Sequence, residues 1–309
     1  MAIRSSMKRH TLSIWRKRYP GLAQWIEVLP YLALTITGFF VFITGPVIAS
    51  FILGFTEWDL LTPPKWIGLG NYRSILFDTP VFWKTMRNTL YYTLLYIPGA
   101  VILPLLVAVV MNQSLRGITL YSAIFFLPVV TTTVAVALVW QWLYNPEFGP
   151  INFFLDLVGI KGPAWLASPD WAIPALVVMS VWQVVGYNMV IYLAGLQGIP
   201  EEFYEAASID GATRLRQFFY ITVPLISPTT FFVLIISIIG SLQVFEQTYV
   251  LTQGGPAYAT LTIAYYIYQQ AFQFFHMGFA AALSYILFLI ILVLTLIQFR
   301  VQKRWVFYN

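Results

Sequence analysis

The chain has 309 residues, of which 59% are hydrophobic and only 9% are charged. A soluble domain carries about 25% charged residues. This composition therefore excludes a water-soluble globule, an intrinsically disordered chain and a nucleic-acid-binding module. The sequence contains no cysteine, which excludes a disulfide framework, a thiolate nucleophile and a Cys-ligated metal. The formal net charge is +5. In a membrane protein, an excess of basic residues indicates how the chain is oriented rather than which partner it binds.

Long stretches without Asp, Glu, Lys or Arg predict the membrane-spanning helices. A helix needs about 20 apolar residues to cross the hydrocarbon, so we trimmed each stretch to its apolar centre. Internal prolines such as Pro98, Pro104 and Pro128 imply kinks, which a bundle tolerates where neighbours or a cavity re-pair the backbone. Residues 257–275 are an alternative seventh span, but their Tyr and Gln content favours an interfacial segment. The six predicted spans are 31–54, 89–111, 120–143, 171–193, 228–250 and 279–299.

The distribution of Lys and Arg predicts the orientation. Basic residues cluster before the first span and after the last, and such clusters mark the cytoplasmic side. Six spans place 12 of the 17 Lys and Arg residues inside. The predicted organisation is a cytoplasmic basic segment 1–30, a six-helix transmembrane domain 31–299 and a cytoplasmic tail 300–309.

The one large loop on the predicted cytoplasmic side, 194–227, carries the most specific pattern. Pro200 suits a helix start, and the two glutamates after it would lie in the first turn, where the helix dipole favours anions. Asp210-Gly211 would end that helix, and an apolar face resumes beyond it. The loop is therefore predicted to form two short helices joined at a glycine, a shape that can dock into a groove on a partner.

This loop resembles the permease subunits of binding-protein-dependent ABC importers, whose signature is E-A-A-x-x-x-G followed by I-x-x-P. Gly254-Gly255-Pro256 and Leu193-Ala194-Gly195 resemble the sugar-uptake branch, the relatives of the maltose permeases. The resemblance implies an all-α membrane protein of the type I importer permease fold, with six transmembrane helices and a cytoplasmic EAA coupling loop at 198–224. Such loops dock into ATPase subunits and transmit their closure to the membrane helices. The coupling residues implied by the resemblance are Glu205, Ala206, Ala207, Asp210, Gly211 and Pro224.

Polar residues inside two spans predict a solute path, because such groups are costly in lipid and usually face the bundle or a cavity. The resemblance places a sugar between the fourth and fifth spans. Several of these residues could instead make only interhelical hydrogen bonds. Glu246 is either a gate or substrate ligand, or a wetted residue of the vestibule. The candidate path residues are Ser180, Gln183, Tyr187 and Asn188 of the fourth span, and Ser237, Ser241, Gln243 and Glu246 of the fifth.

The predicted function is the membrane-spanning permease subunit of an ATP-driven importer for a sugar, a neutral mono- or oligosaccharide. The sequence has no G-x-x-x-x-G-K-[ST] phosphate loop, so the chain is expected to be no enzyme and to bind no cofactor itself. Two distant histidines make a poor metal site, and none is expected. A polyol-phosphate importer is one alternative, although the fourth and fifth spans contain no Lys or Arg. An ion-coupled secondary carrier is another, but no acidic cluster lies within the spans.

The resemblance also implies the assembly and its place in the cell. The partners are a second homologous permease, two cytoplasmic ATPase subunits that use ATP, an extracytoplasmic solute-binding protein and the sugar itself. Nucleic acid is not among the expected partners. The complex would lie in the lipid bilayer of a prokaryotic plasma or inner membrane, with this chain crossing several times and both termini cytoplasmic.

The charge pattern makes the topology testable. Reporter fusions after Gln298 should read as cytoplasmic, and fusions within 144–170 should read as external. An external reading for the C-terminus would rule out the six-span arrangement.

Overall fold

The structure is a computed structural model that describes residues 20–113 and 117–307, in two compact units, 1–53 and 54–309. In the first unit, α2 (Pro20–Phe39) leads through the π-helical turn η1 (Phe40–Thr44) into α3 (Gly45–Leu53). Pro46 is the second residue of α3, and it has no backbone N–H to donate at this point of the helix. Most of the predicted basic segment, 1–19, lies outside the described residues.

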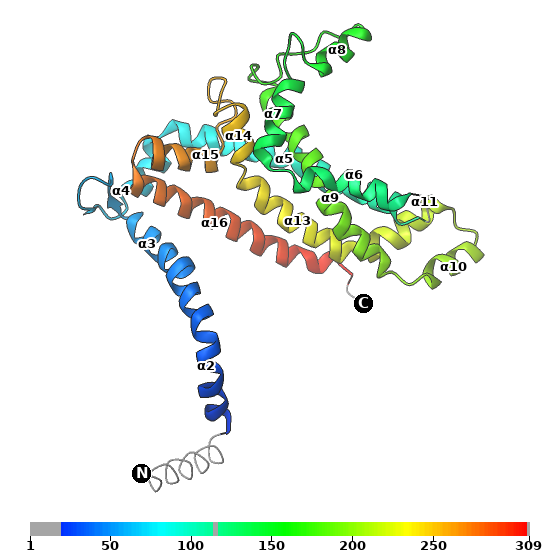
Figure 1. Cartoon of the computed structure of the whole chain (residues 1–309), viewed down its shortest axis with the longest axis horizontal. Helices are drawn as coiled ribbons and strands as arrows, with labels where there is room; N and C mark the ends of the chain where they lie inside the picture. The colour runs from blue at the N-terminus through cyan, green and yellow to red at the C-terminus, as the bar shows by residue number, and fades with distance from the viewer. Residues whose placement is uncertain (1–19, 114–116, 308–309) are drawn as a thin grey trace, which may run out of the picture. The chain divides into compact units, whose positions relative to one another are not determined.

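The second unit is a bundle of helices with one small hairpin (Figure 1). The hairpin pairs β1 (Thr56–Glu57) with β2 (Lys65–Trp66) in antiparallel register. The elements that follow are α4 (Gly70–Arg73), η2 (Ser74–Asp78), α5 (Pro80–Met111), α6 (Ile118–Val130), α7 (Thr133–Leu143), α8 (Pro150–Leu157), α9 (Ala172–Gln197), α10 (Glu202–Ile209), α11 (Arg214–Gln217), η3 (Phe218–Thr222), α12 (Val223–Leu225), α13 (Ser227–Leu242), α14 (Glu246–Leu251), α15 (Ile263–Tyr268), η4 (Gln269–Gln273), α16 (Met277–Val301) and η5 (Gln302–Arg304).

Helix α9 is the centre of this bundle. It packs on α5, α6 and α13, and half of its apolar window is buried. A Cβ at Gly186 would collide with the backbone carbonyl of Phe125 in α6, so only glycine allows the two helices to approach this closely. A Cβ at Gly195 would likewise collide with the Thr229 side chain of α13. The buried core is therefore arranged around α9, while large apolar side chains elsewhere on the bundle face outward.

Most predicted spans match helices of the structure. Five described helices are long and apolar enough to cross a membrane, and a bent pair makes a sixth candidate. α9 and α16 agree with the predictions within a few residues. α5 begins at Pro80 rather than near residue 89, because charged residues end the apolar stretch without ending the helix. Within 257–275 the described residues form only the short α15 and η4, which no longer supports a seventh span.

The predicted third span, 120–143, is not one continuous helix. α6 and α7 meet at 99° across a short break. Pro128 removes a backbone donor near the end of α6, and Thr131 is extended. The Thr132 hydroxyl then accepts a hydrogen bond from the Ala135 N–H at 3.4 Å and caps α7. A second break separates α13 from α14 within the predicted fifth span.

Two groups of connections of the second unit lie at opposite ends of the bundle, while α8 lies beyond α7, away from both groups (Figure 1). α10 and α11 lie at one end, where α5 and α16 finish. α4, α14 and α15 lie at the other end, where α5 and α16 begin. The predicted cytoplasmic loop 194–227 therefore lies at the opposite end of the bundle from α4 and α15.

The contact at Gly186 predicts a stability effect. Gly186→Val should destabilise the bundle by at least about 1–3 kcal/mol, because the new side chain meets backbone that cannot rotate away. Thermal unfolding in detergent measures the effect. Gly240→Ala is the control, since no atom lies within 4 Å of a Cβ there. Equal unfolding temperatures for the two variants would contradict the close approach of α6 and α9.

Candidate functional site

A cavity of ≈ 490 Å³ lies among α5, α6, α9 and the α13–α14 junction. It brings together most of the side chains that the sequence analysis singled out on two separate spans. Its polar wall consists of Ser180, Gln183, Tyr187, Ser241, Gln243 and Glu246. The Tyr187 ring is 47% exposed, so it is presented to the hollow rather than packed away.

Two of the predicted path residues lie elsewhere. Asn188 is fully buried, and its Nδ2 donates to the Ala100 carbonyl of α5 at 2.7 Å. Ser237 is buried and does not line the cavity. Asn188 therefore joins α9 to α5, which is the interhelical alternative considered for such residues.

Sequence reasoning missed two aromatic residues of the cavity. Tyr92 and Tyr96 of α5 line it, with ring centroids 5.7 Å apart and nearly parallel planes. A signal existed, because two tyrosines four residues apart share one helix face. It was weak, because tyrosine is not charged and the second span reads as apolar throughout.

Both helix breaks border this cavity. Val129 lines it just before the α6–α7 break, and Gln243, Val244 and Phe245 line it within the α13–α14 break. The Gln183 Nε2 donates to Thr133 Oγ1 at 3.3 Å and links α9 to the start of α7. Irregular backbone is tolerated inside a membrane where it is buried in protein or lines a polar cavity.

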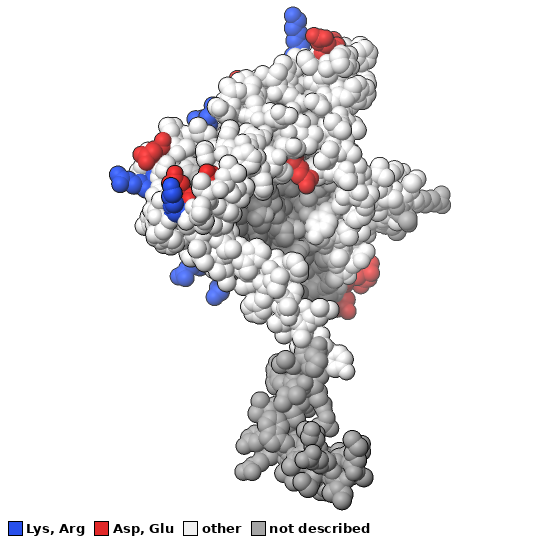
Figure 2. All heavy atoms as spheres, turned by 60° about the vertical axis from the view of Figure 1, so that its left-hand side comes forward, with Lys and Arg blue, Asp and Glu red and all other residues white. Residues whose placement is uncertain are grey.

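The cavity carries little charge. Glu246 is the one ionisable acid among its lining residues, and no Lys or Arg lines it. On the face shown in Figure 2, charged side chains are sparse and lie mostly toward the edges, around a central hollow. Among the described residues, no group of His, Asp and Glu is placed to hold a metal ion.

The predicted coupling loop forms two short helices joined at a glycine. α10 contains Glu205, Ala206 and Ala207, and no residue of α10 is buried. Asp210 is its C-terminal cap, and Gly211 follows with φ 76°, a left-handed conformation that favours glycine. Pro224 lies in α12, at the entry to α13.

A set of side-chain hydrogen bonds fastens α10 to the segment after it. The Tyr204 and Thr222 hydroxyl oxygens are 3.0 Å apart. The Gln217 Nε2 donates to the Ser208 hydroxyl at 2.8 Å and to the Tyr204 carbonyl at 3.3 Å. We call Tyr204, Ser208, Gln217 and Thr222 the polar clamp.

Comparison with known proteins identifies the family to which the chain belongs. Residues 80–306 match the family of binding-protein-dependent transport system inner membrane components. The chain belongs to this family and is a permease subunit of an ABC importer, a multi-pass inner membrane protein.

Relatives of known name support the same assignment. The lactose transport system permease protein LacF of Rhizobium radiobacter is 35% identical over 93% of this chain and 96% of its own length. The sn-glycerol-3-phosphate transport system permease protein UgpA of Pectobacterium atrosepticum is 32% identical over 92% and 95%. A chain in the crystal structure of a bacterial alginate ABC transporter, in complex with an alginate pentasaccharide-bound periplasmic protein, superposes with a TM-score of 0.81. It is 25% identical, and the alignment covers 93% of this chain and 97% of that one.

Proposed function

We propose that this chain is the permease of a sugar importer and that the cavity among α5, α9 and α13–α14 is its solute site. The cavity itself is the observation that supports the proposal. It combines tyrosine rings with hydroxyl and amide groups, which can stack on a sugar ring and hydrogen-bond to its hydroxyls. The named relatives transport saccharides or a polyol phosphate, which is consistent with this chemistry.

The charge of the cavity favours a neutral sugar over an anionic solute. An anion entering a site of low dielectric needs a cation or several oriented donors. The cavity offers the Glu246 carboxylate, which would repel a phosphate, and it offers no Lys or Arg. A polyol phosphate is therefore the second candidate, supported by the likeness to the glycerol-3-phosphate permease alone.

We further propose the assembly. A second homologous permease, two cytoplasmic ATPase subunits and an extracytoplasmic solute-binding protein would complete the importer. ATP would be hydrolysed on the ATPase subunits, and this chain would perform no catalysis. Both termini and α10 would lie on the cytoplasmic side.

The solute site predicts a selective loss of uptake. Tyr187→Ala and Ser241→Leu should each lower sugar uptake by roughly tenfold, the effect of about 1.4 kcal/mol, because one removes a stacking ring and the other fills the cavity. Uptake by proteoliposomes that contain the whole importer measures this, and complex assembly should be unchanged. Tyr121→Ala is the control, because this exposed tyrosine of α6 lies outside the cavity.

A competition assay distinguishes the two solute classes. Lactose and sn-glycerol 3-phosphate are offered to the same proteoliposomes as competitors of the solute that is taken up. Competition by the phosphate alone would favour the polyol-phosphate importer.

Wild-type uptake in both Tyr187→Ala and Ser241→Leu would remove this cavity from the solute path.

Coupling to the ATPase is proposed to run through α10. Its surface is exposed and partly apolar, with Phe203 48% and Ile209 87% exposed, as expected of a helix that docks into a partner. Glu205 is exposed on the same helix and would pair with a basic group there. The polar clamp would make α10 and η3 move together, so that a displacement of α10 reaches α13.

The clamp predicts uncoupling rather than dissociation. Tyr204→Phe combined with Gln217→Leu removes the clamp but leaves the surface of α10 intact. ATPase subunits should still co-purify. The stimulation of ATP hydrolysis by the binding protein should fall about threefold or more, and so should the amount of solute transported per ATP. This is the effect expected from the loss of hydrogen bonds worth roughly 1 kcal/mol.

Two further variants separate docking from transmission. Glu205→Lys should lose the ATPase subunits, since it reverses the charge offered to the partner. Tyr220→Phe should behave as wild type, because Tyr220 is 80% exposed and its hydroxyl takes no part in the clamp. Full stimulation in the clamp variant would contradict transmission through Tyr204 and Gln217.

A further inference from the structure

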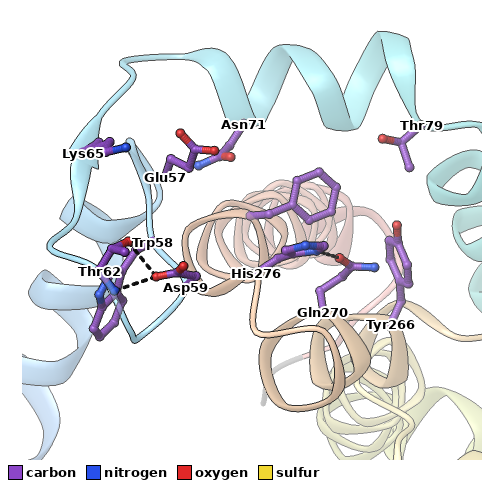
Figure 3. Close-up of a pocket in the computed structure, with 11 residues that line it drawn as sticks. Glu57, Trp58, Asp59, Thr62, Lys65, Asn71, Thr79, Tyr266, Gln270 and His276 are labelled. Atoms are coloured by element: carbon purple, nitrogen blue, oxygen red, sulfur yellow. Dashed lines mark hydrogen bonds between the residues drawn. The ribbon is translucent and has the colours of Figure 1, made fainter.

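A second polar pocket, of ≈ 700 Å³, lies at the end of the bundle opposite α10. Its walls come from the hairpin region 57–65, from α4 and Thr79, and from the α15–α16 region, segments about 200 residues apart in sequence. Figure 3 shows Glu57 and Asn71 along one side, and Tyr266, Gln270 and His276 along the other. We call this the outer pocket. Residues 57–79 follow the first predicted span and residues 266–276 follow the fifth, and with a cytoplasmic N-terminus both connections are predicted to be extracytoplasmic.

The outer pocket is held open by its own hydrogen bonds. The Trp58 carbonyl accepts the N–H of Met277 at 2.9 Å, which ties the hairpin region to the start of α16. The Asn71 Nδ2 donates to the carbonyls of Thr56 at 2.8 Å and Gly54 at 3.0 Å. On the same wall, Phe55 stacks on Trp66 with centroids 5.6 Å apart. A pocket built this way exists before any ligand arrives, so little ordering entropy is lost on binding.

Several polar groups of the outer pocket have no protein partner among the described residues. His276 Nδ1 donates to Gln270 Oε1 at 2.9 Å, and the amide nitrogen of Gln270 has no hydrogen-bond acceptor among the described residues. The Tyr266 hydroxyl and the Glu57 carboxylate are likewise unpaired within the described ranges. The Tyr266 ring itself is buried at 6% exposure, so its position is fixed.

The charges of the outer pocket favour a neutral, hydroxylated ligand. Two carboxylates, Glu57 and Asp59, line it against one ammonium group, that of Lys65. Hydrogen bonds from Thr62 lower the pKa of Asp59, which keeps that carboxylate ionised. A phosphate or sulfonate would therefore meet net negative charge, whereas a sugar hydroxyl can donate to the carboxylates.

The residue types repeat those of the solute cavity. Aromatic rings stand beside amides and one unpaired carboxylate in both places, with Trp58, Tyr266, Gln270 and Glu57 here and with Tyr187, Gln183 and Glu246 in the cavity. Such a combination pairs an apolar surface for the face of a sugar ring with directed donors and acceptors for its hydroxyls.

We propose that the outer pocket is a second carbohydrate-binding site, which holds a neutral sugar unit at the extracytoplasmic face, apart from the cavity among α5, α9 and α13–α14. This proposal rests on the chain being a sugar permease. It assigns a ligand class to a site that the transport path itself does not include.

The test is direct sugar binding to the assembled importer in nanodiscs, without binding protein and without ATP. Saturation-transfer-difference NMR is recorded with lactose, maltose, cellobiose and arabinobiose as probes. Tyr266→Phe removes a hydroxyl, and Glu57→Gln replaces a carboxylate oxygen by an amide NH2, with little change of shape in either case. Each should weaken binding of the responding sugar by about threefold to tenfold. The matched controls Tyr258→Phe and Glu147→Gln lie outside the pocket and should change nothing.

A further variant separates the two sites. Tyr187→Ala should abolish the cavity contribution and leave a signal that remains sensitive to Tyr266→Phe. Binding that is lost in Tyr187→Ala and unchanged in both outer-pocket variants would overturn the second site while leaving the proposed function standing. Absence of binding by every probe would overturn it as well. Unchanged sugar binding with a raised requirement for binding protein would instead identify the outer pocket as a docking surface and overturn the carbohydrate assignment.

Discussion

Backbone hydrogen bonding in a medium without water is the constraint on which this structure depends. Every N–H and C=O within the hydrocarbon must find a partner, so the chain crosses as helices. It leaves regular helix between α6 and α7 and between α13 and α14, and both breaks border the same polar cavity. Backbone N–H and C=O groups that lose their helical partners at a break need polar surroundings, and so does a hydrophilic solute. The positions where the helices break therefore coincide with the proposed solute site.

Helix α9 connects the two functional parts of the molecule. Its middle part carries Ser180, Gln183 and Tyr187 on the cavity wall, and it ends at Gln197, a few residues before α10 begins. Gly186 and Gly195 permit α6 and α13 to pack directly against it. Interiors packed this closely transmit strain rather than absorb it. A displacement at α10 can therefore reach the cavity through one continuous helix, supplemented by the polar clamp that leads into α13.

Much of this was predictable from the sequence, and particular residues show why. Charge-free runs located α9 and α16, because the cost of charge in lipid acts on each residue separately. Asp210-Gly211 predicted the corner between α10 and α11, and Gly211 has the left-handed φ that such a corner requires. Ser180, Gln183 and Tyr187 are spaced by three and four residues, which places them on one helix face, since helical periodicity determines which residues of a helix lie together.

The predictions that the structure did not confirm also have a physical explanation. Asn188 was grouped with its neighbours, but whether it faced the cavity or the carbonyl of Ala100 depended on how α5 lies against α9. Tyr92 and Tyr96 were overlooked for the same reason, and the 99° break at residues 131–132 needed more than Pro128 to locate it.

By itself the sequence determined the approximate positions of most spans, through local composition, and the class of protein, through motifs that resemble a known family. Only the tertiary structure decided which side chains share the cavity and which form the outer pocket. Its walls, Trp58 and Gln270 among them, come from segments distant in the chain. Contacts between distant segments depend on how whole helices pack, and no local pattern records that geometry.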